Sequence, residues 1–245
     1  MARIDDLLRE ALRLLPVKPL PTASQAEKKR YSEQISQCIA LSLAEELRLR
    51  GLREARPAGM GELGDSGAER RMAGGLGAKK VDVTWATEES GLLLAISVKT
   101  INFKDTRTGN YQKNLINRRG DMLMEAVTLH RRFPYSVLAG LFFLDKGAAE
   151  DGTDRRRSTL ENAHSRLQLF TGRNDPAGRE EQFERFYLLL LGADPSEVSI
   201  TAYAVGKPDV IVALDDILND LLALVAQRNP DFYELRPGGS LTKAS

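Results

Sequence analysis

Cysteine and histidine are scarce in this sequence, and long apolar runs are absent. The single cysteine, Cys38, excludes an internal disulfide and a zinc site built from several cysteines. Two histidines, His130 and His164, are too few for a histidine-rich metal site. Every apolar run is far shorter than the ~20 residues that a membrane helix needs. Asp5 and Asp6 occur where a secretory signal would be apolar. We therefore expect a cytoplasmic protein with no membrane partner.

The chain carries little net charge, because 35 Lys and Arg nearly balance 34 Asp and Glu over 245 residues. A hydrophobic content of 42% is typical of a globular protein with a sizeable core. The charges are unevenly spread, however, since residues 99–135 contain eight Lys or Arg and three Asp or Glu. This local excess of positive charge indicates a polyanionic partner such as nucleic acid.

Apolar periodicity and turn signals predict an alternation of helices and strands. Ser24 followed by Glu27 is a capping-box pattern ahead of the longest predicted helix. Residues 55–78 are rich in glycine and alanine and are expected to form a long loop. The predicted helices cover 4–14, 25–50, 115–131, 156–171 and 214–228, and the predicted strands cover 80–84, 92–100, 136–144, 186–191 and 198–205.

This order of elements predicts one α/β domain with a mixed central β-sheet flanked by helices. We expect the domain to span residues 1–236, with a flexible tail at 237–245. Within it, N-terminal helices occupy 4–50, a core that carries the site occupies about 78–145, and further strands and helices occupy 155–236.

The residues that carry chemistry lie on the two strands of a predicted hairpin. Asp82 is on the first strand, and Ser97 and Lys99 share one face of the second, because side chains alternate along a strand. Residues 92–96 of the second strand are all apolar, so a lysine at its end needs a partner to offset the cost of burying its charge. Asp82 is the natural partner across the hairpin. A carboxylate and a backbone carbonyl, here that of Val98, supply oxygen ligands for a divalent ion. The pattern suits metal-assisted phosphodiester hydrolysis.

At these residues the chain resembles the PD-(D/E)xK nuclease superfamily, which includes many type II restriction endonucleases. That pattern places an acid on one strand and (D/E)-x-K on the next, followed by a helix and a strand. Fourteen residues separate Asp82 from Ser97, which stands where the second acid is expected. The chain is similar here to a subset with Ser-x-Lys, which takes the missing carboxylate from the following helix. The resemblance covers about residues 25–145.

The resemblance implies a restriction-endonuclease-like fold and a Mg²⁺-dependent endodeoxyribonuclease, with Mn²⁺ able to substitute. It implies Asp82, the Val98 carbonyl and Glu125 as metal ligands, and Lys99 as the residue that assists the attacking water. Ser97 completes the motif, and a glutamate such as Glu46 supports the metal or the lysine. A role in restriction or anti-phage defence, a homodimer, and a cognate methyltransferase or other defence-system partner are implied as well.

The substitute acid has several candidates. On the helix from residue 115, Arg118, Asp121 and Glu125 lie along one flank of the core face. Glu125 is nearer the core than Asp121 and is therefore the first choice, although this flank can also be read as a row of helical salt bridges. Glu46 falls in the middle of the apolar stripe of the long helix, where a carboxylate needs a metal, water or arginine partner. Glu69 competes for the same role.

Basic and amide side chains follow the second strand of the hairpin and are candidates for contact with DNA. Lysine and arginine suit phosphates, while arginine, asparagine and glutamine can read base edges. The same residues can instead form a solvated basic loop. The candidates are Lys104, Arg107, Lys113, Asn114, Arg118 and Arg119, and Arg155–Arg157 can form a second phosphate contact.

The sequence is also compatible with two other functions. Ser97 in place of an acid favours a DNA-binding module of the same fold that cuts nothing. A protein-interaction subunit, in which Asp82 and Lys99 form a structural ion pair, would lack salt-dependent DNA affinity.

Overall fold

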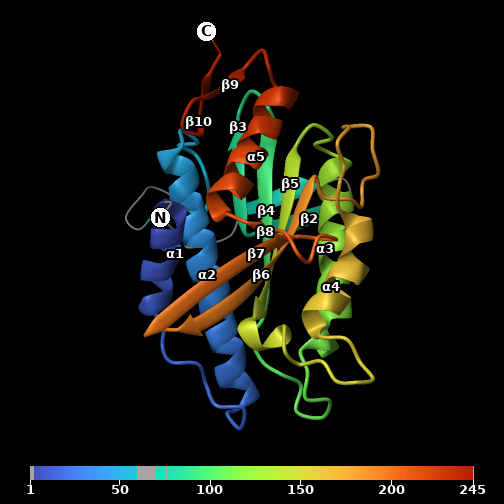
Figure 1. Cartoon of the computed structure of the whole chain (residues 1–245). Coiled ribbons are helices and arrows are strands. Elements are labelled where there is room, and N and C mark those ends of the chain that lie inside the picture. The colour runs from blue at the N-terminus through green and yellow to red at the C-terminus, as the bar shows by residue number, and fades with distance from the viewer. Residues whose placement is uncertain (1–2, 60–69, 75–76, 245) are drawn as a thin grey trace.

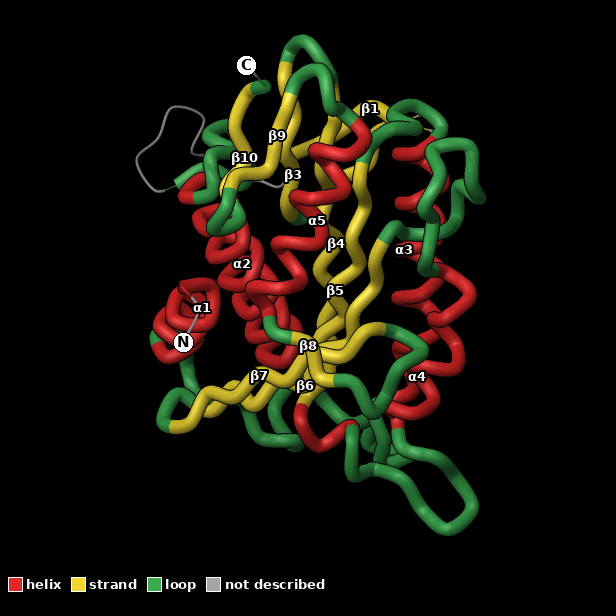
Figure 2. The backbone as a smooth tube through the Cα atoms, turned by 45° about the horizontal axis from the view of Figure 1, so that its top comes forward, coloured by secondary structure: helices red, strands yellow, loops and turns green. Residues whose placement is uncertain are grey.

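A six-stranded β-sheet forms the middle layer of the molecule and is covered by helices on both faces (Figures 1 and 2). The computed structural model describes residues 3–59, 70–74 and 77–244. The α-helices are α1 (Arg3–Arg13), α2 (Gln25–Leu49), α3 (Leu115–His130), α4 (Thr159–Leu167) and α5 (Leu214–Arg228). The strands of the central sheet are β3 (Val83–Thr87), β4 (Gly91–Ile101), β5 (Val137–Asp145), β6 (Arg185–Asp194), β7 (Glu197–Ala204) and β8 (Ile211–Val212).

The strands of this sheet lie side by side in chain order, from β3 to β8. The central pairs β4–β5 and β5–β6 are parallel, whereas β3–β4, β6–β7 and β7–β8 are antiparallel. The central strands are apolar because helices cover both of their faces, and residues 137–144 of β5 are all buried. This mixed sheet with flanking helices confirms the predicted fold class.

Two hydrophobic clusters fill the spaces between the layers. One joins α1, α2 and α5 to one face of the sheet, through residues such as Ile96 and Val98 of β4. The other joins α3 and α4 to the opposite face, through residues such as Ala95 and Ile101 of the same strand. Strand β4 therefore presents alternate side chains to the two helical layers. None of the described helices is long and apolar enough to span the hydrocarbon core of a membrane.

Several boundaries differ from the prediction. The expected strand at 80–84 is divided at Asp82 into β2 (Gly77–Val81) and β3, which pair with different partners. Part of the expected loop at 55–78 forms β1 (Arg70–Gly74), which pairs with β2. The expected helix at 156–171 begins only at Thr159, because Ser158 and Glu161 form a capping box there.

The C-terminal segment is also more ordered than expected. Instead of a loose tail at 237–245, β10 (Ser240–Lys243) pairs with β9 (Tyr233–Arg236) in a hairpin. Gly238 and Gly239 form its turn with φ values of 92° and 76°, which favour glycine. Leu241 is only 4% exposed and its backbone N donates to the carbonyl of Arg50 at 2.8 Å. The tail therefore packs against the end of α2.

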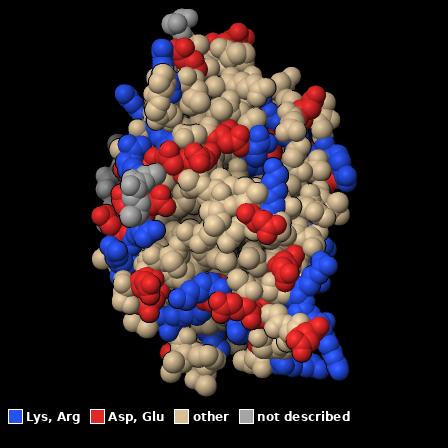
Figure 3. Space-filling model, viewed as in Figure 1, with Lys and Arg blue, Asp and Glu red and all other residues tan. Residues whose placement is uncertain are grey.

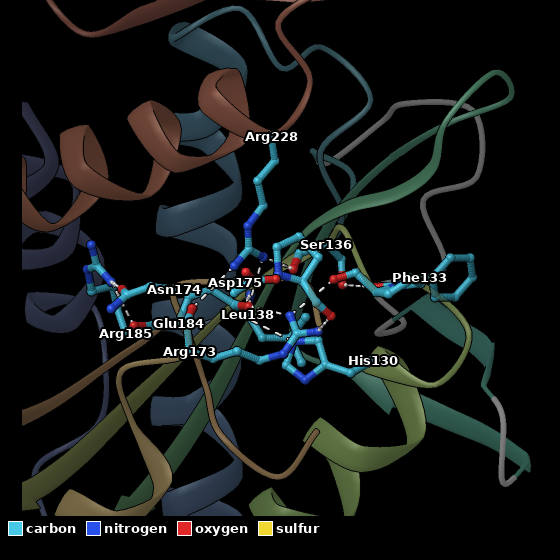
Figure 4. Close-up of polar contacts among 12 residues, drawn as sticks. His130, Phe133, Ser136, Leu138, Arg173, Asn174, Asp175, Glu184, Arg185 and Arg228 are labelled. Carbon is cyan, nitrogen blue, oxygen red and sulfur yellow. Dashed lines mark hydrogen bonds and ion pairs between the residues drawn. The ribbon is translucent and has the colours of Figure 1, made fainter. Parts of the chain in front are cut away.

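A fully buried carboxylate ties the segment before β6 to the sheet (Figure 4). Glu184 Oε1 accepts from Arg173 Nη1 and from Arg228 Nη1, both at 2.8 Å. Its Oε2 accepts from the backbone N of Leu138 at 2.7 Å and lies 3.3 Å from His130 Nε2. Burial alone would raise the pKa of Glu184, but the bonds and charges of these neighbours lower it to about 2. The cluster is thus a charged anchor inside the core.

The described chain includes three short 3₁₀ helices beside these elements, at Gln112–Asn114, Lys146–Ala148 and Gln168–Phe170.

Candidate active site

Asp82 and Lys99 meet where the end of β4 passes the junction between β2 and β3. Asp82 Oδ2 accepts from the backbone N of Val98 at 2.6 Å and lies 3.3 Å from Lys99 Nζ. The hydrogen bond from the backbone of β4 fixes the carboxylate of Asp82. Asp82 is also the residue that separates β2 from β3. The pairing that strand alternation predicted is therefore present in the structure.

Glu125 approaches the same lysine from α3, the helix that covers this face of the sheet. Its Oε2 lies 3.7 Å from Lys99 Nζ, and its side chain is 7% exposed. Burial lowers the pKa of Lys99, but the charges of Glu125 and Asp82 outweigh that effect and raise it. Lys99 is therefore an ammonium held between two carboxylates. Asp121, the other helix candidate, has a 62% exposed side chain 3.9 Å from Arg118 instead.

An open cleft of about 1240 Å³ lies over this group. Its floor includes Asp82, Val98, Lys99 and Glu125. One wall is formed by the N-terminal half of α2, and the other by residues 101–114 and the start of α3. Among the described residues that line the cleft, seven are Lys or Arg and five are Asp or Glu. The cleft is thus slightly basic around an acidic floor.

Ser97 and Glu46, two of the predicted site residues, lie elsewhere. Ser97 is 1% exposed and does not line the cleft, and its Oγ has no hydrogen-bond partner in the described part of the chain. Glu46 is fully buried, and its carboxylate accepts from Arg3 Nε and Arg50 Nε, each at 2.7 Å. The role expected of Glu46 at the metal is wrong, because two arginines already satisfy it away from the cleft. Glu69 lies outside the described residues.

The predicted DNA-contacting residues fall into two groups. Lys104, Lys113, Asn114 and Arg118 line the cleft.

Arg107 and Arg119 are the two that the structure places outside the cleft. Arg107 is exposed at the tip of a loop whose backbone N–H groups at Arg107 and Thr108 donate to Asp105 Oδ1. The guanidinium of Arg119 lies over the ring of Phe170, 5.7 Å from its centroid. Arg107 therefore stays available to an outside partner, whereas Arg119 has an internal one.

Sequence reasoning missed the wall of the cleft that α2 forms. The signal in the sequence is a polar residue at every fourth position, from Gln25 to Gln37.

On the face of the molecule in Figure 3, acidic and basic side chains are interspersed, so net surface charge gives little guidance to the site.

The donor atoms at the floor suit a hydrated magnesium ion. No three His, Cys, Asp or Glu side chains gather as a metal-binding group within residues 3–59, 70–74 and 77–244. Mg²⁺, however, usually takes only one or two carboxylates and keeps several waters. Asp82 and Glu125 converge on one lysine, and Val98 also lines the cleft. Asp82, Glu125 and Val98 are therefore the described residues that would hold the ion, in competition with the ammonium of Lys99.

Comparison with known proteins gives no match to a family model, to a curated protein or to a solved structure.

Proposed function

We propose that this protein is a Mg²⁺-dependent endodeoxyribonuclease, related to the PD-(D/E)xK enzymes, in which Mn²⁺ can substitute. The observation that carries the proposal is the convergence of Asp82 and Glu125 on Lys99 at the floor of a cleft with basic walls. The proposal identifies Glu125 as the substitute for the acid that Ser97 replaces.

Each residue at the floor has a distinct role in this proposal. Asp82, Glu125 and the Val98 carbonyl would hold the ion, which when bound lowers the pKa of a water and polarises the phosphate. Lys99 is protonated, so it donates hydrogen bonds to the attacking water or to a phosphate oxygen and offsets negative charge. Lys104, Lys113 and Arg118 line the cleft, where they would contact the phosphates of the bound strand.

A restriction or anti-phage role belongs to the same proposal and rests on the resemblance alone. We propose a cytoplasmic homodimer, because cleavage of both strands of a duplex is readily achieved by two symmetric centres. A cognate methyltransferase or other defence-system partner would accompany a restriction role.

A second candidate is a DNA-binding module without nuclease activity. The observation in its favour is that Ser97 is buried and does not line the cleft, and that only two carboxylates approach Lys99 in the described structure. Such a module would bind DNA without a metal and leave it intact.

The deciding experiment incubates the purified protein with supercoiled plasmid and phage DNA in Mg²⁺, Mn²⁺ or EDTA. The proposal predicts metal-dependent cleavage that Asp82→Asn, Lys99→Met and Glu125→Gln each reduce at least about a hundredfold. Asp216→Asn, an exposed acid on α5, is the matched control and keeps wild-type cleavage. Salt-dependent DNA binding without cleavage would favour the module, and absence of any DNA binding would favour a protein-interaction subunit.

A further inference from the structure

The N-terminal half of α2 carries two parallel rows of side chains along the cleft. Residues four apart lie on one face of a helix. The outer row is Gln25, Lys29, Glu33 and Gln37, all exposed and all lining the cleft. The inner row is Lys28, Ser32, Ser36 and Ala40, all partly or fully buried and lining the same cleft.

The inner row fastens α2 to the strand that carries Lys99. Ser36 Oγ lies 3.3 Å from Thr100 Oγ1, and Asn102 Nδ2 donates to Ser32 Oγ at 3.1 Å. Thr100 follows Lys99 directly in the chain. The outer row is therefore held at a fixed position relative to the floor of the cleft, and Figure 1 shows this end of α2 at the same end of the molecule as the loop of residues 102–114.

The side chains of the outer row make few polar contacts within the protein. Gln25 and Gln37 make no side-chain hydrogen bond to any residue in the described part of the chain. Lys29 and Glu33 form one ion pair of 3.7 Å with 78% and 66% exposed side chains, and such an exposed pair is readily opened by a partner. Four long polar side chains are thus presented to the cleft, two of them without a side-chain hydrogen bond in the described part of the chain and two joined in one exposed ion pair.

The chemistry of this row matches the edges of base pairs in duplex DNA. Glutamine can bond adenine in a bidentate manner, lysine can donate to guanine, and glutamate can accept from the amino group of cytosine. The major groove of B-DNA admits an α-helix. Gln25 and Gln37 are twelve positions apart, which is a rise of about 18 Å along the helix axis. This rise matches about five base pairs at 3.4 Å each.

We propose that the row Gln25, Lys29, Glu33 and Gln37 reads base sequence in the major groove of DNA bound in the cleft. This inference rests on the proposed nuclease function for its ligand, and it adds the residues that set sequence specificity. Because the inner row fastens α2 to β4, recognition by α2 and cleavage over Lys99 occur at a fixed spacing along the DNA.

The test compares wild type with Gln25→Ala, Gln37→Ala and Gln34→Ala. Gln34 is on the same helix but does not line the cleft, so its variant is a matched control. Each protein is given a library of duplexes with random sequence. Bound duplexes are sequenced after selection in Ca²⁺, and cut ends are sequenced after incubation in Mg²⁺.

We expect wild type and Gln34→Ala to select the same sequence. Gln25→Ala and Gln37→Ala should each lose at least about tenfold preference at one base position, with the other positions retained. Identical sequence profiles in all four proteins, or binding without any sequence preference, would overturn the inference. Selective binding without cleavage would support the inference and refute the nuclease, whereas cleavage without sequence preference would do the reverse.

Discussion

Acid should weaken the fold through Glu184, whose carboxylate lies fully buried between Arg173 and Arg228. Its pKa is lowered from 4.5 to about 2 in the folded protein. A group with a lowered pKa adds stability above its unfolded pKa, and this contribution disappears as pH falls towards the folded value. A change of this size corresponds to about 3 kcal/mol in total, of which about 2 kcal/mol is lost between pH 5 and pH 3.

The variant Glu184→Gln isolates this contribution. At pH 7 it should unfold about 3 to 5 kcal/mol more easily than wild type, because two arginines lose their buried anion. The difference between the proteins should shrink by about 2 kcal/mol between pH 5 and pH 3, since only wild type has this group to protonate. Urea unfolding followed by circular dichroism at several pH values measures both effects.

The control is Glu197→Gln, which changes an exposed acid on β7. We expect it to alter the free energy of unfolding by less than about 0.5 kcal/mol at every pH. If the difference in free energy of unfolding between wild type and Glu184→Gln stays constant from pH 5 to pH 3, the interpretation of an ionised Glu184 is refuted.

Two further predictions concern the surroundings of the cleft. Ser97→Ala should leave the free energy of unfolding unchanged or raise it, because Ser97 Oγ is buried with no hydrogen-bond partner among the described residues. A decrease in this free energy of more than about 1 kcal/mol, measured by urea unfolding, would contradict the prediction. Arg107→Ala should weaken DNA binding and reduce the slope of log affinity against log salt by about one. Arg119→Ala, which removes a guanidinium that lies over Phe170, should leave that slope unchanged, and equal slopes for the two variants would refute the distinction.

The pairing of Asp82 with Lys99 could be predicted because it follows from local rules. Strand alternation and the length of the hairpin fix which side chains face each other, and a buried lysine requires an anion. Helix periodicity likewise separated Glu125 from Asp121, and the structure brings only Glu125 to Lys99. These inferences need no knowledge of how distant segments pack.

Only part of the fate of Glu46 follows from a local rule: its partner Arg50 lies four residues further along α2, whereas Arg3 is 43 residues away on α1. Sequence periodicity shows that a carboxylate falls on a packing face, but not which helix covers it. The same limit applies to the hairpin of β9 and β10, whose Leu241 is buried by packing near Arg50 at the end of α2. The wall formed by α2 depends on the hydrogen bond that Asn102 donates to Ser32 and on the one between Ser36 and Thr100 of β4, which no local pattern shows.

The position of Lys99 between two carboxylates has a consequence for metal binding. An ammonium that contacts Asp82 and Glu125 competes with a divalent cation for the same oxygens and repels it. Lys99→Met should therefore bind Mn²⁺ about tenfold more tightly than wild type, while its cleavage activity falls. Titration calorimetry with Mn²⁺ alone measures the affinity without reference to activity. Asp82→Asn, which removes a proposed ligand, should weaken Mn²⁺ binding in the same assay. Unchanged or weaker Mn²⁺ binding by Lys99→Met would show that the metal does not use these carboxylates.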